Sequence, residues 1–439
     1  MAPWSCRPII PGYARKMKGF PAALLALVLA LFAAAPAAQA KRGACTPGDT
    51  KKCIVWNAKV TFVDDGDTVD VDIAGDHTSR RFRVRMTGVD AAELSVYSRD
   101  PSKLRGVCHG IEATAFTEGL IKGSRHRVRL TAQRASSRSG HRLRRRVLVR
   151  ANGHWTDLSK LLLSSGNALY LPNKTENAGA TEYSRLAQEA AARGVGLYDT
   201  DYCGAGPEPA SQLRVRVKWD ADGTDAHNVN GEWVEVRNLD PANPVALGGW
   251  SLGDSEHKKR FRFPAGTVIP ADGRIRLHAG HGTDDGNDFY WGFDKSHFEP
   301  EPGGDGGYLF DPQADLRFWM MYPCRVGCSD PATGSLSVSA SPQRPESVSV
   351  RNTGGGAIDL ADYILWLPFH QYEFGSNSTL GPGETLRLDI EGNPSNDTRL
   401  HRSYGFSGNM MEDDGGRVLL RNYRDVTLDC DSWGSGSCS

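Results

Sequence analysis

The segment "VTFVDDGDTVDVDIAG" places five aspartates in a stretch that otherwise alternates like a β-strand. They are Asp64, Asp65, Asp67, Asp70 and Asp72. The last two alternate with valine and isoleucine and are expected on the solvent face of the strand. The first three surround a single glycine at the entrance of the strand, where carboxylates can form a turn, hold a metal ion or take part in catalysis.

Further ionisable groups follow in "RMTGVDAAEL". If the segments 54–64, 68–74 and 81–89 form one meander, Asp67 and Asp90 lie at the ends of neighbouring strands. Two carboxylates and a carbonyl there would suit a hard cation such as Ca²⁺. Charged residues at strand ends are more often simply solvated, and composition alone leaves that interpretation open.

Two side chains near this position could act on a substrate. Glu93 lies three residues beyond Asp90 in a predicted loop, where its carboxylate could position a water molecule. Arg85 lies on the strand that leads to Asp90, and its guanidinium could reach a phosphate group held by the metal ion.

The surrounding sequence predicts a small β-barrel followed by helices. Apolar residues at helical spacing predict a helix over 110–123 that stops at a glycine. "HRVRLTA" and "RRRVLVRANG" are typical of strands, whereas 157–166 is typical of a helix with Asp157 as its N-cap. A last helix is expected to end at Gly194. This part of the chain is therefore expected to be an α+β unit.

The order "DGDTV", a strand, "RxxxxVDxxE" and then "GxEAxAFT" on a helix resembles staphylococcal nuclease, also called thermonuclease, and its relatives. The resemblance covers about residues 54–203. It implies an OB-fold barrel with helices that hydrolyses DNA and RNA with one Ca²⁺. By position, Asp67 and Asp90 would bind Ca²⁺ with the backbone carbonyl of Ala91.

The same resemblance implies catalytic roles. Glu93 would be the general base, acting through water. Arg85 would neutralise the phosphate oxygens as charge builds in the transition state. Counting back from "ANG" (151–153) places the family's second catalytic arginine at Arg144.

That last assignment stays open within the arginine cluster at 142–146. The family usually has Tyr-Gly before its second arginine, and this chain has Arg142 and Leu143. Strand alternation places residues 142, 144 and 146 on one face, so a slip in the count still leaves an arginine there.

Other substrate contacts are expected from basic and aromatic residues. Arg142, within the basic run around 125–150, is expected to bind phosphates. Tyr170 lies near the position where the family has a base-stacking or phosphate-contacting tyrosine, with a core or surface tyrosine as the competing interpretation. Ala91 and Ala92 replace the family's Thr-Pro, which loosens the loop that carries Glu93.

The formal net charge of zero conceals an asymmetry. Residues 41–203 carry 27 Lys and Arg against 18 Asp and Glu, whereas residues 204–439 carry 21 against 34. A basic first half favours a polyanionic partner, and an acidic second half should repel one. Nucleic acid is therefore a candidate partner for the first half.

The first forty residues have the order of a secretory signal. Basic residues precede the apolar run "FPAALLALVLALFAAAP", and "AQA" precedes a cleavage position expected after Ala40. An uncleaved membrane anchor is the alternative. No later segment is apolar enough to span a bilayer. We expect a secreted, extracellular protein, either free or attached to the cell surface.

The cysteines agree with export. Eight remain after the signal is removed, an even number that indicates disulfides. The favoured pairing joins neighbours, although the sequence alone cannot fix it. The pairs would be Cys45–Cys53, Cys108–Cys203, Cys324–Cys328 and Cys430–Cys438.

The second half of the chain contains an internal repeat of strands and turns after a Pro/Gly linker at 204–211. "EWVEVRNLDPANPVALGGWSL" matches "ESVSVRNTGGGAIDLADYIL", and "GGYLFDPQADLRFWMMYPC" matches "GGRVLLRNYRDVTLDC". The unit resembles the lamin tail domain, through "NGEWVEVRN", "LGGWSL" and "FPAGTVIPADG". The resemblance implies two immunoglobulin-like β-sandwiches, at 212–330 and, more degenerate, at 331–439.

These features predict a multidomain protein: a signal peptide (1–40), a nuclease-like domain (41–203) and two all-β sandwiches. The expected function is a secreted, Ca²⁺-dependent endonuclease of DNA and RNA with little sequence specificity. The sandwiches are expected to bind or attach the enzyme, for example to a cell-wall or surface ligand. The alternatives are a catalytically inactive nucleic-acid-binding protein and a surface-attachment protein on a nuclease fold.

Overall fold

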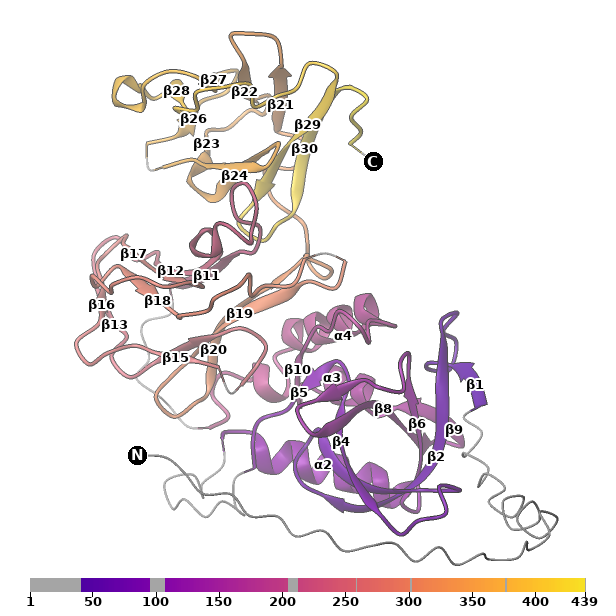
Figure 1. Ribbon diagram of the computed structural model, residues 1–439. Helices are drawn as coiled ribbons and strands as arrows, with labels where there is room; N and C mark the ends of the chain where they lie inside the picture. Colours follow the sequence, from indigo (N-terminus) through magenta and orange to yellow (C-terminus); the bar gives the residue numbers. More distant parts are fainter. Residues whose placement is uncertain are drawn as a thin grey trace, which may run out of the picture. The chain divides into compact units, whose positions relative to one another are not determined.

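The structure is a computed structural model that describes residues 41–94, 107–203, 212–257, 259–300, 302–375 and 377–438 (Figure 1). The predicted signal peptide and the predicted linker at 204–211 lie outside the described residues. The described residues belong to one compact unit, Ala40–Ser439. No helix among them is long and apolar enough to cross a membrane.

The first part is a barrel of β-strands with three described helices, here called the barrel domain. The strands are β1 (Lys41–Ala44), β2 (Lys52–Val63), β3 (Thr68–Ile73), β4 (Arg81–Met86), β5 (Val89–Asp90), β6 (Arg127–Ala132), β7 (Arg138–Ser139), β8 (Arg142–Ala151), β9 (His154–Asp157) and β10 (Leu169–Tyr170). The helices are α2 (Gly110–Gly123), α3 (Leu158–Ser164) and α4 (Ala180–Ala192). The order β2-β3-β4-β8-β6 closes on itself through pairing of β6 with β2. A closed five-stranded barrel of this kind is compatible with an OB-fold.

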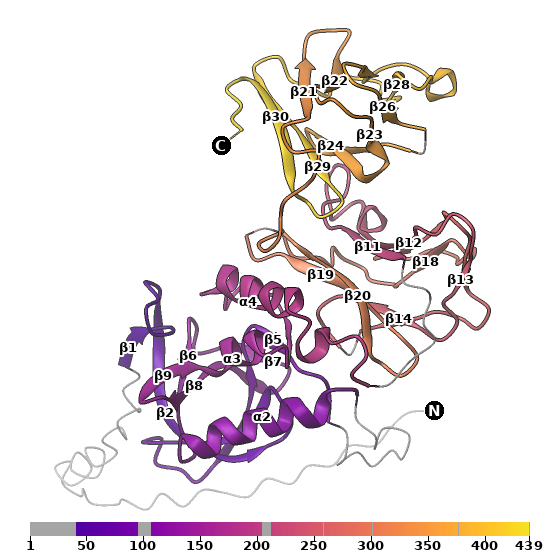
Figure 2. The same ribbon diagram turned by 180° about the vertical axis from the view of Figure 1, so that it is seen from behind.

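The predicted local elements are confirmed. Strands β2, β3 and β4 form the expected antiparallel meander. Val69 and Val71 point into the barrel core and are fully buried, as the alternation requires. Helix α2 contributes Ala113 and Ile121 to the same core, and it lies against the barrel in both views (Figures 1 and 2). Asp157 caps α3 by accepting a hydrogen bond from the backbone N–H of Ser159.

Two β-sandwiches of the same topology follow. In the first sandwich one sheet is β11 (Leu213–Lys218), β12 (Trp233–Asn238), β17 (Arg274–His278) and β18 (Asp288–Tyr290), and the other is β15 (Phe261–Arg262), β14 (Ser251–Gly253), β19 (Asp305–Phe310) and β20 (Leu316–Tyr322). In the second sandwich the matching sheets are β21 (Leu336–Ser341), β22 (Ser347–Asn352), β27 (Thr385–Asp389) and β28 (His401–Ser403), and β25 (His370–Glu373), β24 (Tyr363–Leu367), β29 (Gly415–Asn422) and β30 (Thr427–Gly434). Each copy adds a two-stranded sheet: β13 (Val245–Ala246) with β16 (Val268–Ile269), and β23 (Ile358–Asp359) with β26 (Thr379–Leu380).

Equivalent residues make the same contacts in the two sandwiches, which confirms the internal repeat. Leu213 pairs with Asn238 in the first copy, and Leu336 pairs with Asn352 in the second. Both asparagines are buried, and the side-chain amide of each donates to two backbone carbonyls. A buried amide satisfied in this way fixes the neighbouring loops against the sheet.

The barrel domain and the first sandwich share an apolar cluster. Leu169, Leu197 and Tyr198 of the barrel domain pack with Tyr308 and Phe310 of β19, and all are nearly inaccessible to solvent. All four predicted disulfides are present, including the one that joins Cys108 before α2 to Cys203 after α4.

Candidate active site

The candidate site begins with the turn that enters β3. The side chain of Asp65 accepts a hydrogen bond from the backbone N–H of Asp67, 3.0 Å away, so this acid shapes the turn. The carboxylate of Asp67 is completely buried and accepts from the Thr68 hydroxyl at 3.0 Å and from the Ala91 N–H at 2.7 Å. The turn therefore places the Asp67 carboxylate directly beside residue 91.

Arg85 draws the two predicted metal ligands together. Its guanidinium contacts the Asp67 carboxylate through Nη1 and the Asp90 carboxylate through Nη2. Arg85 lies on β4 opposite Thr68 of β3, and Asp90 lies on β5, which pairs with β10. Two carboxylates that reach one guanidinium lie close together, as predicted, although Asp90 is carried by β5 and not by the meander itself.

Glu93 follows β5 by three residues and is half-buried. Its backbone carbonyl accepts from the N–H of Val107 at 2.9 Å, just before α2. The candidate general base is therefore held between the strand that carries Asp90 and the start of a helix. Residues 95–106, between these two points, lie outside the described part of the chain.

Arg144 on β8 lies directly opposite Arg85 in the parallel pairing of β4 and β8. Burial and then the positive charges of Arg85 and Arg142 lower the pKa of Arg144. Its buried Nε has no hydrogen-bond partner among the described residues. Arg142, two residues before Arg144 on the same strand, donates to the Thr68 hydroxyl at 3.3 Å. The site thus holds two arginines in register and a third at its edge.

Tyr170 lies in the core rather than on an open surface. It pairs with Val89 through β10, and 4% of the residue is exposed. Burial raises the pKa of its hydroxyl, and the negative charge of Asp305 raises it further. The ring has no exposed face on which a base could stack, so this position favours the competing interpretation of a core tyrosine.

Excess negative charge marks the turn. Burial and then the charge of Asp67 raise the pKa of Asp65 to about 6. Asp65, Asp67 and Asp90 place three buried carboxyl groups around this turn, and Arg85 forms ion pairs with two of them, Asp67 and Asp90. Carboxylate oxygens are ligands that Ca²⁺ prefers, so the chemistry of Asp67 and Asp90 fits that cation, whereas Ala91 faces Asp67 through its N–H.

A loop of the first sandwich completes the site, and sequence reasoning missed it. The backbone N–H of His257 donates to Oδ2 of Asp90 at 2.5 Å. The His257 ring is buried near Phe310, and burial with the charges of Arg260 and Arg85 lowers its pKa well below the usual value. The carboxylate of Glu256 acts electrostatically on Arg144. No signal in "DSEHKKR" distinguishes this loop from an ordinary charged turn.

A second cluster with metal-ligand chemistry has a different explanation. Cys108, His109, Cys203 and Asp315 lie close together. The two cysteines are joined in a disulfide, so neither offers a thiolate. The cluster is therefore a structural junction between the barrel domain and the first sandwich.

Comparison with known families identifies one region of the chain. The family model of the lamin tail domain matches residues 214–322, which span the first sandwich from β11 to β20. This match confirms the resemblance predicted for the first copy. No curated protein matches the chain.

Proposed function

We propose that this protein is an exported endonuclease that hydrolyses phosphodiester bonds of DNA and RNA in a Ca²⁺-dependent reaction. The observation that carries the proposal is the convergence of Asp67 and Asp90 on Arg85, with Arg144 in register on the next strand. Carboxylates beside paired guanidinium groups are what hydrolysis of a phosphodiester requires: a place for a cation and donors for the charged oxygens.

The residues divide the reaction between them. Asp67, Asp90 and the carbonyl of Ala91 would hold Ca²⁺, which when bound supplies positive charge to the phosphate and to a bound water. Arg85 and Arg144 stabilise the negative charge that builds on the phosphate oxygens.

The Glu93 carboxylate accepts the proton of the attacking water, and the leaving 5′ oxygen takes up a proton, so that a 5′-hydroxyl and a 3′-phosphate result. Arg142 adds a contact to a phosphate of the bound strand.

The remaining parts of the chain support this activity outside the cell. Residues 1–40 direct export, and the barrel is an OB-fold of the staphylococcal nuclease type. The two sandwiches are immunoglobulin-like lamin tail domains that attach the enzyme, with a cell-wall or surface polymer as ligand. What supports this assignment is the shared topology of the two copies and the family match of the first.

The second candidate function is nucleic-acid binding without catalysis. One observation favours it: Asp90 Oδ2 accepts the His257 N–H, and Arg85 contacts both carboxylates, so the chain itself engages the proposed metal ligands. Such a protein would bind DNA with a steep salt dependence and would not cleave it.

Cleavage assays with the full exported chain separate the two functions. Single-stranded DNA, duplex DNA and RNA are each incubated with Ca²⁺ and with EDTA. Glu93→Gln is expected to lower kcat by roughly 10²- to 10⁴-fold, the usual contribution of a general base. Glu118→Gln, the same change on the exposed face of α2, serves as the matched control and should retain full activity. Undiminished cleavage by Glu93→Gln or after complete chelation would refute the mechanism, and salt-dependent binding without cleavage would establish the alternative.

A further inference from the structure

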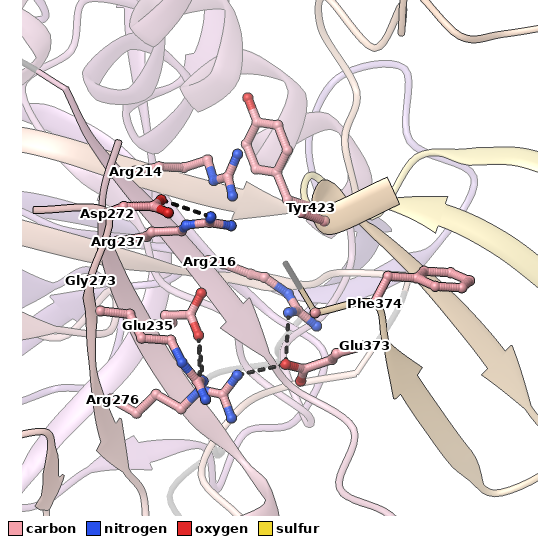
Figure 3. Close-up of a pocket in the computed structure, with 13 residues that line it drawn as sticks. Arg214, Arg216, Glu235, Arg237, Asp272, Gly273, Arg276, Glu373, Phe374 and Tyr423 are labelled. Atoms are coloured by element: carbon pink, nitrogen blue, oxygen red, sulfur yellow. Dashed lines mark hydrogen bonds and ion pairs between the residues drawn. The ribbon is translucent and has the colours of Figure 1, made fainter. Parts of the chain in front are cut away.

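One face of the first sandwich gathers arginines in an otherwise acidic half of the chain. Strands β11, β12 and β17 contribute five of them to a single pocket of about 470 Å³ (Figure 3). They are Arg214, Arg216, Arg237, Arg274 and Arg276. We call this the arginine pocket. Its acids are three, Glu235, Asp272 and Glu373, so the pocket carries a surplus of positive charge.

The arginines form two rows across the sheet. In the first row Arg214 is paired with Arg237 on β12, which is paired in turn with Arg274 on β17. Three like charges stand directly opposite one another across neighbouring strands, about 5 Å apart from strand to strand. Such an arrangement costs folding free energy, because like charges in cross-strand pairs repel. Acids offset part of this repulsion, because Glu235 pairs with Arg274 at 2.9 Å and Asp272 pairs with Arg237 at 3.1 Å.

The second row is neutralised by the protein itself. Glu235 lies between Arg216 and Arg276 in the register, and Glu373 of the second sandwich contacts both arginines. The guanidinium groups of both arginines also lie over the ring of Trp233. This row has a structural role as an ion-pair clamp, and Figure 3 shows its dashed contacts converging on Glu373.

The first row is more open to solvent. The Arg274 side chain pairs with Glu235 at 2.9 Å and is still 51% exposed, and the Arg237 side chain is 22% exposed. Asp272 pairs with Arg237 at 3.1 Å but is itself 60% exposed, a geometry in which an ion pair contributes little. Arg214 stacks on the ring of Tyr423, 4.5 Å from its centroid, so an aromatic face flanks the row.

The second sandwich shows that this fold does not require these arginines. By register, the positions of Arg214 and Arg274 are taken by Ser337 and Thr385 in the second copy. Arg216 and Glu235 likewise correspond to serines. The same sheet is built in both copies, so the complete row of arginines is a property of the first copy alone.

We propose that the arginine pocket binds the phosphodiester backbone of single-stranded nucleic acid. It would be a second binding site for the polymer, separate from the candidate active site. Guanidinium groups pair with phosphate oxygens through their fork of donors. A basic row beside one aromatic ring, Tyr423, suits a flexible single strand, whose phosphates the guanidinium groups can neutralise. The role as a substrate-holding site rests on the proposed nuclease function, whereas binding itself can be measured without cleavage.

The test exchanges residues between the two copies. Arg214→Ser/Arg274→Thr gives the first sandwich the residues that the second already carries, so the sheet should fold. Arg351→Ser/Arg387→Thr removes the same charge from the matching face of the second sandwich and is the control. All variants carry Glu93→Gln, and binding of fluorescein-labelled oligothymidylate is followed by anisotropy in EDTA over a salt series.

The expected result is a loss of affinity on the order of tenfold in the first-sandwich variant, with the salt slope smaller by about 1.4 for two lost contacts. The control should bind like the parent. An equal loss in both variants, or an unchanged slope in the first, would overturn the proposal. Equally tight binding of polyglutamate would also overturn it, because the pocket would then serve acidic polypeptides.

Folding and catalysis are checked separately. If the double variant unfolds, the single variant Arg274→Thr replaces it, because Glu235 stays paired with Arg276 in that variant. The single variant should show half of the change in salt slope. If the unmodified chain cleaves no nucleic acid but binding depends on the pocket, the proposed nuclease function is contradicted and the proposed binding site stands. If the unmodified chain cleaves nucleic acid but the residue exchange leaves binding unchanged, the proposed nuclease function stands and the proposed binding site is overturned.

Discussion

The consecutive arginines of β8 do different work although they share one strand. Arg146 is fully buried, pairs with Glu176 at 3.3 Å, and donates to the backbone carbonyls of residues 176 and 178. The Glu176 carboxylate also accepts the backbone N–H groups of Gln133 and Arg134. Arg146 is therefore a structural residue that ties the loop after β10 to the barrel.

Arg146→Ala is expected to lower the free energy of unfolding by about 3–5 kcal/mol, because it leaves the Glu176 charge buried and uncompensated. Arg142→Ala, on the same strand but half-buried at the edge of the site, should lower it by less than about 1 kcal/mol. Urea denaturation of both variants measures the difference. Equal stability of the two would contradict the division of roles.

Asp315 gives a residue-scale prediction about pH. Burial raises the pKa of this carboxyl from its ordinary 3.8 to about 6. Between about pH 4 and 6 the folded state then binds more protons than the unfolded state, so Asp315 makes stability fall as pH rises through that window. Asp315→Asn keeps an acceptor for the Cys203 N–H and should be more stable at neutral pH, by on the order of 1–3 kcal/mol. Thermal unfolding from pH 4 to 7 measures this, and a wild-type pH profile in the variant would contradict it.

The sequence predicted which acids and which arginine meet at the site, but it did not distinguish the roles of the neighbouring arginines on β8. Asp67 lies in the turn before β3, Arg85 on the paired strand β4 and Asp90 five residues further on β5, so their approach follows from local chain order. Arg145 and Arg146 could not be separated from Arg144 in the same way. Their partners, Trp56 beneath Arg145 and Glu176 beside Arg146, are distant in sequence and meet them only when the barrel closes.

At the scale of elements, the site depends on the close approach of a turn, a strand and a helix at Gly66. A Cβ at this position would lie 2.7 Å from the Cβ of Ala91 and 2.8 Å from that of Ala113 on α2. The Thr117 hydroxyl of the same helix donates to the Gly66 carbonyl at 2.6 Å. Helix α2 thus fixes the turn that carries Asp67.

Gly66→Ala is expected to destabilise the barrel by about 1–3 kcal/mol, because the added methyl group must displace packed backbone. Cleavage should fall further than stability explains, since the shift moves Asp67 away from Arg85. Gly119→Ala is the control. Gly119 lies on α2 with open space around it, so this change should be neutral or stabilising. A fully active Gly66→Ala variant would show that the approach does not position Asp67.

The elements themselves were largely predictable, because hairpins and amphipathic helices are local patterns. Strands β2 to β4, helix α2 and the cap of α3 all follow from residue periodicity. The parallel pairing of β4 with β8, which sets Arg85 against Arg144, joins strands separated by a helix and three other strands. Its register depends on barrel closure and could not be read from either strand.

At the scale of the whole molecule, the first sandwich is part of the candidate site. Glu256 acts on Arg144, and the backbone of His257 contacts Asp90. Glu256→Gln removes a negative charge that competes with phosphate for Arg144, so KM for DNA is expected to fall on the order of two- to fivefold, as for a weak ion pair. Glu412→Gln, exposed on the second sandwich, is the control. A higher KM in Glu256→Gln would mean that Glu256 positions Arg144 instead of competing with substrate.

The shared apolar cluster predicts that the barrel domain and the first sandwich unfold together. Phe310 packs among barrel residues, lies near the His257 ring and supports the Arg260 guanidinium. Phe310→Ala should cost about 3–5 kcal/mol. Hydrogen exchange should then quicken on both sides of the junction, at the amides of Leu169 and of His257.

Phe374→Ala, in the core of the second sandwich, provides the comparison. It creates a cavity of the same kind, but its cluster contains no residue of the barrel domain. Exchange should quicken in the second sandwich while the barrel amides stay protected. If Phe310→Ala likewise leaves the barrel amides protected, the first sandwich is an independent folding unit, and its loop over Asp90 can leave the site without any cost to the barrel.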